Sequence, residues 1–211
     1  MALEIQTFVG GSLETNGYLV GDRQSGDALM IDAPQGVTAG VVQAANAGGW
    51  RITEIVITHA HWDHIIDAAA LREATGAPLL AHPLAVDRLA RPGSAIFELP
   101  FTITPVTPDR LLNEGDEVAL GDLWFFQVLH LPGHDPAHIA LFSDRERAFF
   151  GGDVVFPGGH GTLEVPGADP AAMGRSLGKL VDLPSDTVVY PGHGATTTLG
   201  AEPWISQMAT R

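Results

Sequence analysis

The sequence contains no cysteine among its 211 residues, and this absence excludes three kinds of chemistry. Without cysteine the chain forms no disulfide, carries no thiol nucleophile and offers no thiolate to a metal. Any metal that the chain binds must therefore be held by nitrogen and oxygen atoms.

Positive charge is scarce. The chain has 11 Lys and Arg residues against 25 Asp and Glu residues, a net charge of -14, and Lys179 is its single lysine. Such a surface repels phosphate backbones, so we expect no nucleic-acid partner. The acidity itself is most simply interpreted as a contribution to solubility.

Long apolar runs are missing as well, since glycine, proline or charge interrupts every apolar stretch before it reaches the ~20 residues of a membrane-spanning helix. The N-terminus, Met1-Ala2-Leu3-Glu4, lacks the basic and apolar regions of a signal peptide. We therefore predict a cytoplasmic protein with no membrane partner. Apolar residues make up 45% of the chain, enough for the core of a single domain over residues 1–211.

The hydrophobic pattern predicts strands and helices that alternate along the chain. Strands are predicted at 3–9, 18–20, 28–31, 52–58, 78–81, 123–131, 139–143, 148–150 and 187–190, and helices at 37–47, 63–75 and 169–181. Residues 92–108, rich in Pro and Thr, are predicted to form an ordered loop that crosses between two halves. The pattern indicates an α/β fold of four layers, with two sheets facing inward and helices outside.

Metal-binding side chains gather directly after the strand predicted at 52–58, in the run from His59 to His64. His59 and His61 are two residues apart, so in an extended segment both point the same way. Asp63 and His64 follow where the chain turns into a helix. Three imidazoles and one carboxylate within six residues are typical ligands of a first-row metal ion.

Three more candidate ligands follow apolar strands farther along the chain. They are His134 after Gly133, Asp153 after Gly152, and His193 after Gly192. In each case the strand delivers one side chain to the same rim, and glycine lets the backbone approach closely. Together with the first run, these turns predict one metal centre.

This order of histidines and aspartates resembles the metallo-β-lactamase superfamily, and within it the small glyoxalase II-like hydrolases. The resemblance covers nearly the whole chain and implies an αββα sandwich of two mixed β-sheets with helices outside. It also implies two metal sites and a bridge between them. The implied ligands are His59, His61 and His134 for one ion, Asp63, His64 and His193 for the other, and Asp153 as the bridge.

The chemistry that the resemblance implies is metal-dependent hydrolysis of a small-molecule thioester or a related acyl compound. The cofactors would be two divalent metal ions, zinc first, with iron or manganese as alternatives for the same ligands. Two such ions ~3.5–4 Å apart share a water and lower its pKa, and the bound hydroxide then attacks the acyl carbon. Asp63 would be the catalytic residue that both ligates and orients this nucleophile.

The chain departs from the family pattern where glutathione would be held. Full-length glyoxalase II enzymes carry an added helical region with basic residues, whereas only 18 residues follow His193 here. Related small members often read Gly-Arg-Thr-Asp after the bridging aspartate, whereas this chain has Gly161-Thr162-Leu163-Glu164. The missing arginine removes a planar anion-binding group, so we do not expect glutathione to be gripped in that way.

Other polar and aromatic residues near these turns have open interpretations. His138 is either a partner that orients a ligand or a structural histidine. His160 is a candidate to overhang the substrate pocket, and Trp62 either walls that pocket or packs into the core. Three phenylalanines are candidates for the substrate face: Phe97, Phe101 and Phe156.

Three other functions remain as alternatives. A persulfide dioxygenase with a single iron would need only His59, His134 and Asp153, because two imidazoles and one carboxylate suit ferrous iron. A lactonase or β-lactamase-like hydrolase would use the same fold. A non-catalytic binding module is the least favoured alternative, since such relatives usually lose ligands and all seven are present here.

Overall fold

The computed structural model describes residues 3–94 and 98–210 and contains two six-stranded sheets. The first sheet has the order β1-β2-β3-β4-β5-β6. Its strands are β1 (Glu4–Gly10), β2 (Thr15–Asp22), β3 (Asp27–Ile31), β4 (Arg51–Val56), β5 (Leu79–Ala81) and β6 (Arg110–Leu111). The three strands β1 to β3 are antiparallel, whereas β3 to β6 are parallel. The sheet is therefore mixed.

The second sheet has the order β12-β11-β10-β9-β8-β7. Its strands are β7 (Glu117–Leu120), β8 (Trp124–His130), β9 (Ile139–Ser143), β10 (Ala148–Gly152), β11 (Val188–Pro191) and β12 (Thr197–Thr198). All neighbours in this sheet are antiparallel except β10 and β11. Consequently β8, β10 and β11 all run in the same direction, and their carboxyl ends meet at one edge.

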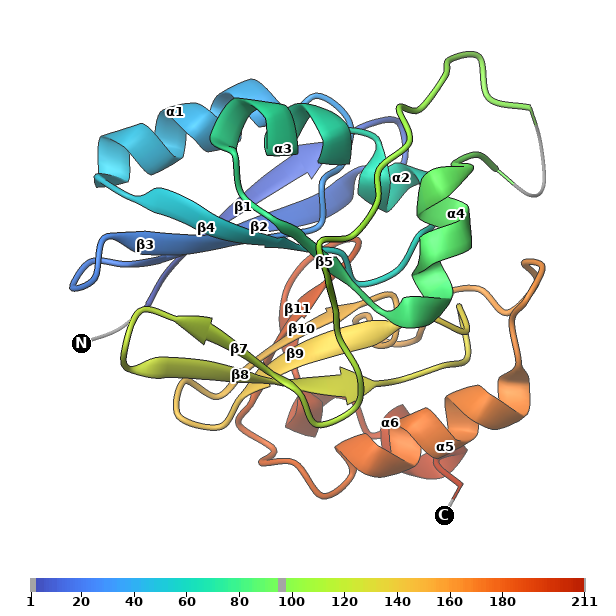
Figure 1. Ribbon diagram of the computed structural model, residues 1–211. Coiled ribbons are helices and arrows are strands. Elements are labelled where there is room, and N and C mark those ends of the chain that lie inside the picture. The colour runs from blue at the N-terminus through green and yellow to red at the C-terminus, as the bar shows by residue number, and fades with distance from the viewer. Residues whose placement is uncertain (1–2, 95–97, 211) are drawn as a thin grey trace.

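Helices cover the outer faces of both sheets (Figure 1). Helices α1 (Thr38–Gly48) and α3 (Ala68–Thr75) lie over the first sheet, and α5 (Pro170–Leu180) and α6 (Trp204–Met208) lie over the second. The short elements are α2 (Trp62–Ile65), η1 (Pro83–Ala85), α4 (Val86–Ala90) and η2 (Leu199–Ala201). None of the helices in the described part of the chain is long and apolar enough to cross a membrane.

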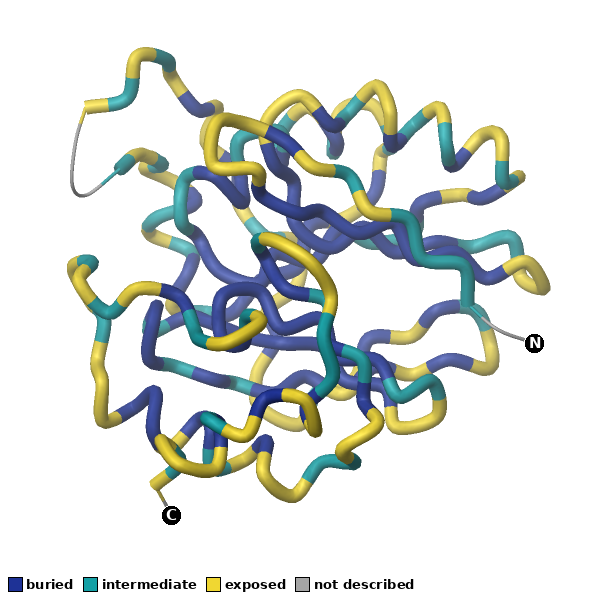
Figure 2. The backbone as a smooth tube through the Cα atoms, turned by 180° about the vertical axis from the view of Figure 1, so that it is seen from behind, coloured by how far each residue is buried: buried dark blue, intermediate teal, exposed yellow. Residues whose placement is uncertain are grey.

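Three apolar layers hold these elements together. One lies between the first sheet and α1 and α3, the second between the two sheets, and the third between the second sheet and α5 and α6. The middle layer contains the fully buried side chains of Trp124, Phe126 and Phe150, and burying each such side chain is worth about 1.5–3 kcal/mol. The buried strands run between exposed outer turns (Figure 2). The four-layer αββα prediction is confirmed.

Residues 63–75, predicted as one helix, form two helices, α2 and α3. The helix breaks because Ala33, which follows β3, forms backbone hydrogen bonds with His64 and Asp67. The backbone carbonyl of His64 accepts the N–H of Ala33 at 2.8 Å, and the carbonyl of Ala33 accepts the N–H of Asp67 at 2.9 Å. These bonds replace helical ones, since Asp67 would otherwise donate to Asp63. The break turns the metal-binding run away from the direction of α3.

Asp67 has a different role from the one its position in a helix would give it. Its carboxylate accepts the backbone N–H of Thr38 at 3.0 Å and the hydroxyl of Thr38 at 2.7 Å. It therefore caps the start of α1 from another element, in place of Val37, whose side chain makes no cap bond.

The variant Asp67→Ala should lower the free energy of unfolding by about 1 kcal/mol, the usual cost of losing a helix cap. Denaturant unfolding at neutral pH measures this change. An unchanged midpoint and slope would contradict the capping role.

Several short elements were not predicted. They are helix α4, strands β6 and β7, and the C-terminal β12 and α6, each two to five residues long. The prediction that residues 92–108 cross between the two halves is wrong. Strand β6 still pairs with β5 in the first sheet, so the chain crosses only between Leu111 and Glu117.

Candidate metal centre

The predicted ligands all lie beyond the carboxyl ends of strands. His59 follows β4, His134 follows β8, Asp153 follows β10 and His193 follows β11. Because β8, β10 and β11 run in the same direction, the last three side chains come to one edge of the second sheet. A bridge between Thr15 and His193, with the bond from the Asn16 N–H to the Gly192 carbonyl at 2.7 Å, joins this edge to the first sheet.

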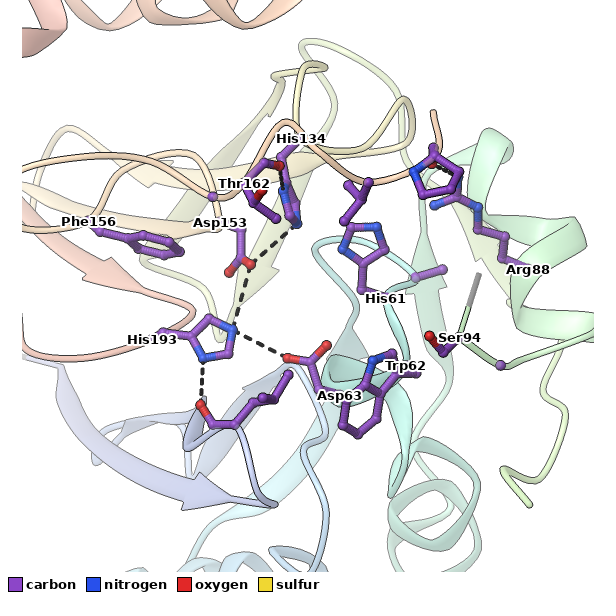
Figure 3. A pocket seen from close by; sticks show the side chains of 16 residues that line it. His61, Trp62, Asp63, Arg88, Ser94, His134, Asp153, Phe156, Thr162 and His193 are labelled. Carbon is purple, nitrogen blue, oxygen red and sulfur yellow. Dashed lines mark hydrogen bonds and ion pairs between the residues drawn. The ribbon is translucent and has the colours of Figure 1, made fainter. Parts of the chain in front are cut away.

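The seven predicted ligands form overlapping groups whose ligand atoms lie within 4.8 Å of one another. The groups are His59, His61 and His134; His59, His64 and Asp153; and Asp63, His64 and His193. Asp153 connects them, because its Oδ1 lies 3.4 Å from His64 Nε2 and its Oδ2 lies 3.4 Å from His134 Nε2. The structure therefore brings together all seven residues that the sequence indicated. Figure 3 shows the five of them that line the cavity, namely His61, Asp63, His134, Asp153 and His193.

Four inward-facing nitrogen and oxygen atoms of this cluster have no hydrogen-bond partner in the part of the chain that the structure describes. Nε2 of His59, His64 and His134 and Oδ1 of Asp153 are buried and have no hydrogen-bond partner among the described residues. Buried polar atoms are nearly always satisfied, so four open ones around a common point need an explanation. Divalent metal ions accept just this set of imidazole and carboxylate donors. The residues present therefore fit such ions.

The outer nitrogens of two histidines are held by one buried carboxylate, Asp32. His64 Nδ1 lies 2.8 Å from Asp32 Oδ2, and His59 Nδ1 lies 3.1 Å from the hydroxyl of Thr58. That hydroxyl donates to Asp32 Oδ2 at 2.8 Å, and the Thr58 N–H donates to Oδ1 at 2.8 Å. Asp32 holds an unusual φ of 57° at the end of β3. These bonds fix both rings with Nε2 directed inward.

The outer nitrogens of the other three histidines also face oxygen atoms. His134 Nδ1 lies 2.7 Å from the carbonyl of Thr162, and His193 Nδ1 lies 3.0 Å from the carbonyl of Leu13. His61 Nε2 lies 3.5 Å from the carboxylate of Asp135. Each ligand histidine thus has one nitrogen positioned by the protein and one left for a metal, the arrangement found around bound metals.

The two carboxylates that face the centre have pKa values below the usual range of aspartate. Burial would raise the pKa of Asp63, but the charge of His64 and a hydrogen bond from His193 lower it to about 2. Burial also opposes ionisation of Asp153, and His64 and His134 outweigh it, so its pKa lies well below the usual range. Both groups are therefore ionised at neutral pH and available as ligands.

Four of the ligand histidines have shifted pKa values, two raised and two lowered. Burial lowers the pKa of His64, but the carboxylates of Asp63 and Asp153 outweigh it and raise that pKa well above 6.5. The pKa of His193 is raised as well, since a hydrogen bond to Asp63 outweighs burial. Burial instead lowers the pKa of His59 far below 6.5 and, with the charge of His134, lowers that of His61 to about 4.

These opposite shifts predict a stability maximum near pH 6.5 for the metal-free protein. The stabilisation from His64 and His193 is complete below 6.5 and is lost as the pH rises through their higher folded pKa values. His59 and His61 destabilise the folded protein only below pH 6.5. In that range these imidazoles bind protons in the unfolded chain but stay neutral in the folded one. Each group changes the free energy of unfolding by at most about 1.4 kcal/mol per pH unit.

Metal binding requires neutral imidazoles, so the stabilisation by added Zn²⁺ should grow as the pH rises above about 6.5. Thermal unfolding with chelator and with Zn²⁺, at about pH 5.5, 6.5 and 8.5, measures both effects. A metal-free protein that became steadily more stable above pH 6.5 would contradict the ion pairs around His64.

A cavity of about 390 Å³ opens onto the ligands. It is lined by Leu13, Ala60, His61, Trp62, Asp63, Arg88, Gly93, Ser94, His134, Asp153, Phe156, Gly161, Thr162, Val165, Pro166 and His193. Most of the lining side chains without charge are apolar, and Phe156 and Trp62 lie beside the ligands (Figure 3). The cavity thus surrounds a polar centre with apolar walls, as small-molecule sites usually do.

The other predicted pocket residues have mixed positions. Trp62 lines the cavity and also packs against the core beside Phe101. Phe156 lines the cavity, whereas Phe101 does not. Phe97 lies outside the described residues. His160 is not among the lining residues, because its ring packs beside Trp204 at 5.8 Å and its Nδ1 faces the carbonyl of Gly161 at 2.7 Å.

His138 lies directly behind the ligands. It is fully buried, stacks on the ring of His59 at 4.8 Å, and its Nε2 accepts the backbone N–H of Asp153 at 3.0 Å. Burial lowers its pKa well below 6.5, so it is neutral and able to accept that bond. Its contacts hold both a predicted ligand and the predicted bridge, which agrees with the orienting interpretation.

Sequence reasoning missed four residues that support the ligands: Asp32, Thr15, Asp135 and Arg88. Thr15 donates its hydroxyl to Asp63 Oδ2 at 2.8 Å. Asp32 carried a usable signal, because it follows the strand predicted at 28–31 and therefore stands on the same rim. The other three gave none, since their partners are distant in the sequence.

The sequence model of the metallo-beta-lactamase superfamily matches residues 10–193, which is most of the chain. The chain therefore belongs to the metallo-β-lactamase superfamily. A hydroxyacylglutathione hydrolase of Methylobacterium sp. (strain 4-46) is 33% identical over 206 residues, which cover 95% of this chain and 72% of that protein. The hydroxyacylglutathione hydrolase GloC of Haemophilus influenzae is 31% identical over 196 residues, covering 90% of this chain and 91% of that one.

A solved structure agrees with this assignment. The crystal structure of TTHA1623 in a di-iron-bound form is 35% identical, has a TM-score of 0.82, and covers 94% of this chain and 99% of that chain. Family, relatives and fold together make the chain a metal-binding hydrolase of the αββα type.

Proposed function

We propose that the protein hydrolyses a thioester or related acyl compound with two divalent metal ions, in the manner of a hydroxyacylglutathione hydrolase. One observation carries this proposal. Two groups of three ligands each have their own set of close donor atoms, and Asp153 lies within 3.4 Å of a histidine from each. A cluster built for one ion would not need the second group.

The ligand roles follow from this arrangement. His59, His61 and His134 would hold the first ion, and Asp63, His64 and His193 the second, with Asp153 between them. When bound, two such ions supply Lewis acidity and bring the pKa of a water molecule toward neutrality. Zinc is our first choice, and the di-iron form of TTHA1623 supports iron as the alternative.

Asp63 would orient the attacking water. Its carboxylate lines the cavity, and Thr15 and His193 hold its Oδ2 at 2.8 and 3.3 Å. We therefore assign this carboxylate the task of accepting a hydrogen bond from the water and so orienting it.

The lining of the cavity favours a small acyl substrate whose binding does not depend on several basic side chains. Among the described lining residues Arg88 is the only lysine or arginine, and it is already ion-paired with Asp135. The walls near the ligands are apolar, formed by Leu13, Trp62 and Phe156. Such walls bind an acyl chain or an alkyl thiol better than a highly charged peptide.

The mononuclear dioxygenase alternative is less well supported. It would use His59, His134 and Asp153 and leave Asp63, His64 and His193 without a task. Yet those three residues lie as close together as the first group and are held by their own partners, Asp32, Thr15 and the carbonyl of Leu13.

The test is elemental analysis of native protein followed by a substrate screen with thioesters, lactones, β-lactams and glutathione persulfide. We expect about two equivalents of metal per chain and preferential hydrolysis of a thioester. One equivalent of iron with rapid oxygen uptake on the persulfide would overturn the proposal.

A further inference from the structure

A fully buried carboxylate, Asp135, lies behind His61. Its Oδ2 is 3.5 Å from His61 Nε2, and its Oδ1 accepts the backbone N–H of Ala137 at 2.7 Å. Because Nε2 faces this carboxylate, Nδ1 is the nitrogen of His61 that remains for a metal. A buried carboxylate is costly unless a positive partner accompanies it.

That partner is Arg88, which reaches Asp135 from helix α4. Its guanidinium forms an ion pair with Asp135 Oδ2 and lies 3.4 Å from the carbonyl of Pro166. The side chain of Arg88 is partly exposed and lines the cavity on the same side as His61 (Figure 3). Cavity wall, guanidinium, carboxylate and ligand histidine thus form one continuous chain of contacts.

We propose that Arg88 and Asp135 are positioning residues for the first metal ion, and this proposal rests on the two-metal function proposed above. Asp135 holds the proton of His61 on Nε2, fixes the ring and makes Nδ1 a better donor. Arg88 pairs with this carboxylate and holds it in place. No other predicted ligand of the first ion has a carboxylate directly on its outer nitrogen, since His59 uses Thr58 and His134 uses a carbonyl.

Asp135→Asn tests the role of the charge, because asparagine keeps an oxygen for the Ala137 N–H. We expect one of the two Zn²⁺ equivalents to bind about 10- to 100-fold more weakly, as loss of such a partner usually causes. Competition with a chromophoric chelator measures this affinity on folded protein, with circular dichroism as the check on folding. The second equivalent should keep its wild-type affinity.

Arg88→Met provides a second variant at a partly exposed side chain, so the test survives if Asp135→Asn does not fold. It should weaken the same Zn²⁺ equivalent, and Arg88→Lys should restore part of the affinity because it keeps the charge.

Asp109→Asn is the control at an exposed carboxylate with the same kinds of partner. Asp109 also pairs with an arginine, Arg72, at 2.6 Å and also accepts a backbone N–H, from Leu79 at 2.9 Å, but it contacts no ligand. It should bind both Zn²⁺ equivalents like the wild type. A positioning role is overturned if Asp135→Asn and Arg88→Met bind zinc normally, or if Asp109→Asn weakens binding equally.

The chelator competition uses no substrate, which separates this proposal from the proposed function. If the wild type hydrolysed no thioester while Asp135→Asn lost one high-affinity zinc, the substrate assignment would fail and the positioning role would stand.

Discussion

Asp153→Asn should lower kcat/KM for thioester hydrolysis by at least about 10²-fold, the usual effect of removing one strong electrostatic contact. Its two oxygens lie 3.4 Å from His64 Nε2 and from His134 Nε2, so one side chain serves both ligand groups. The amide keeps the shape and removes the negative charge that binds a cation. We expect the variant to fold and to lose at least one metal equivalent.

Asp22→Asn is the control for this prediction. Asp22 is equally buried and accepts backbone N–H bonds from Gln24 and Ser25, but it is the last residue of β2, at the opposite end of the sheet from the ligands. Its metal content and turnover should match the wild type. Wild-type turnover by Asp153→Asn, measured with a thioester assay and elemental analysis, would refute the bridging role.

Gly192→Ala should be nearly as damaging, although it adds only one methyl group. A Cβ at this position would overlap Asp153 Oδ1 and lie 2.8 Å from His64 Cε1. The backbone has no room to shift, because the Gly192 N–H donates to the Gly152 carbonyl and its carbonyl accepts the Asn16 N–H, both at 2.7 Å. Displacing a predicted ligand by about 1 Å typically costs about 10²-fold in rate.

The matched control is Gly159→Ala. An added Cβ there meets nothing within 4 Å, and its φ is not positive. This variant should retain metal and activity, whereas Gly192→Ala should lose about 1–3 kcal/mol of stability as well as turnover. Equal activity of the two variants would show that the close approach at Gly192 does not matter for the site.

The long strands and the ligands themselves were predictable from the sequence. Strands such as β9 and β10 are buried along their whole length and consist almost entirely of apolar residues and glycine, as expected where both faces are covered. His134, Asp153 and His193 each follow a strand in a glycine-containing turn, and the run from His59 to His64 follows β4, so the order of residues alone indicated a shared rim. The crowding at Gly152 and Gly192 gives those glycines a physical cause, because a Cβ at Gly152 would lie 2.6 Å from His138 Nε2.

What failed to be predicted depends on tertiary contacts. The break between α2 and α3 comes from hydrogen bonds to Ala33. Ala33 lies in an earlier part of the chain, after β3, so the local sequence around residues 63–75 does not indicate the break. The bond from His64 to Asp32 spans 32 residues, and the pair of Arg88 and Asp135 spans 47. Helix α4, which carries Arg88, is five residues long and has no clear periodicity. The ligands of the site could therefore be predicted from the sequence, whereas the residues that support them could not.

Titration of metal-free protein with Zn²⁺ while following thioester hydrolysis tests the central claim most directly. The ligand arrangement predicts that turnover rises with added metal and reaches its plateau at about two equivalents per chain. Turnover that is complete at one equivalent, or a thioester left intact at every metal concentration, would contradict a two-metal hydrolase.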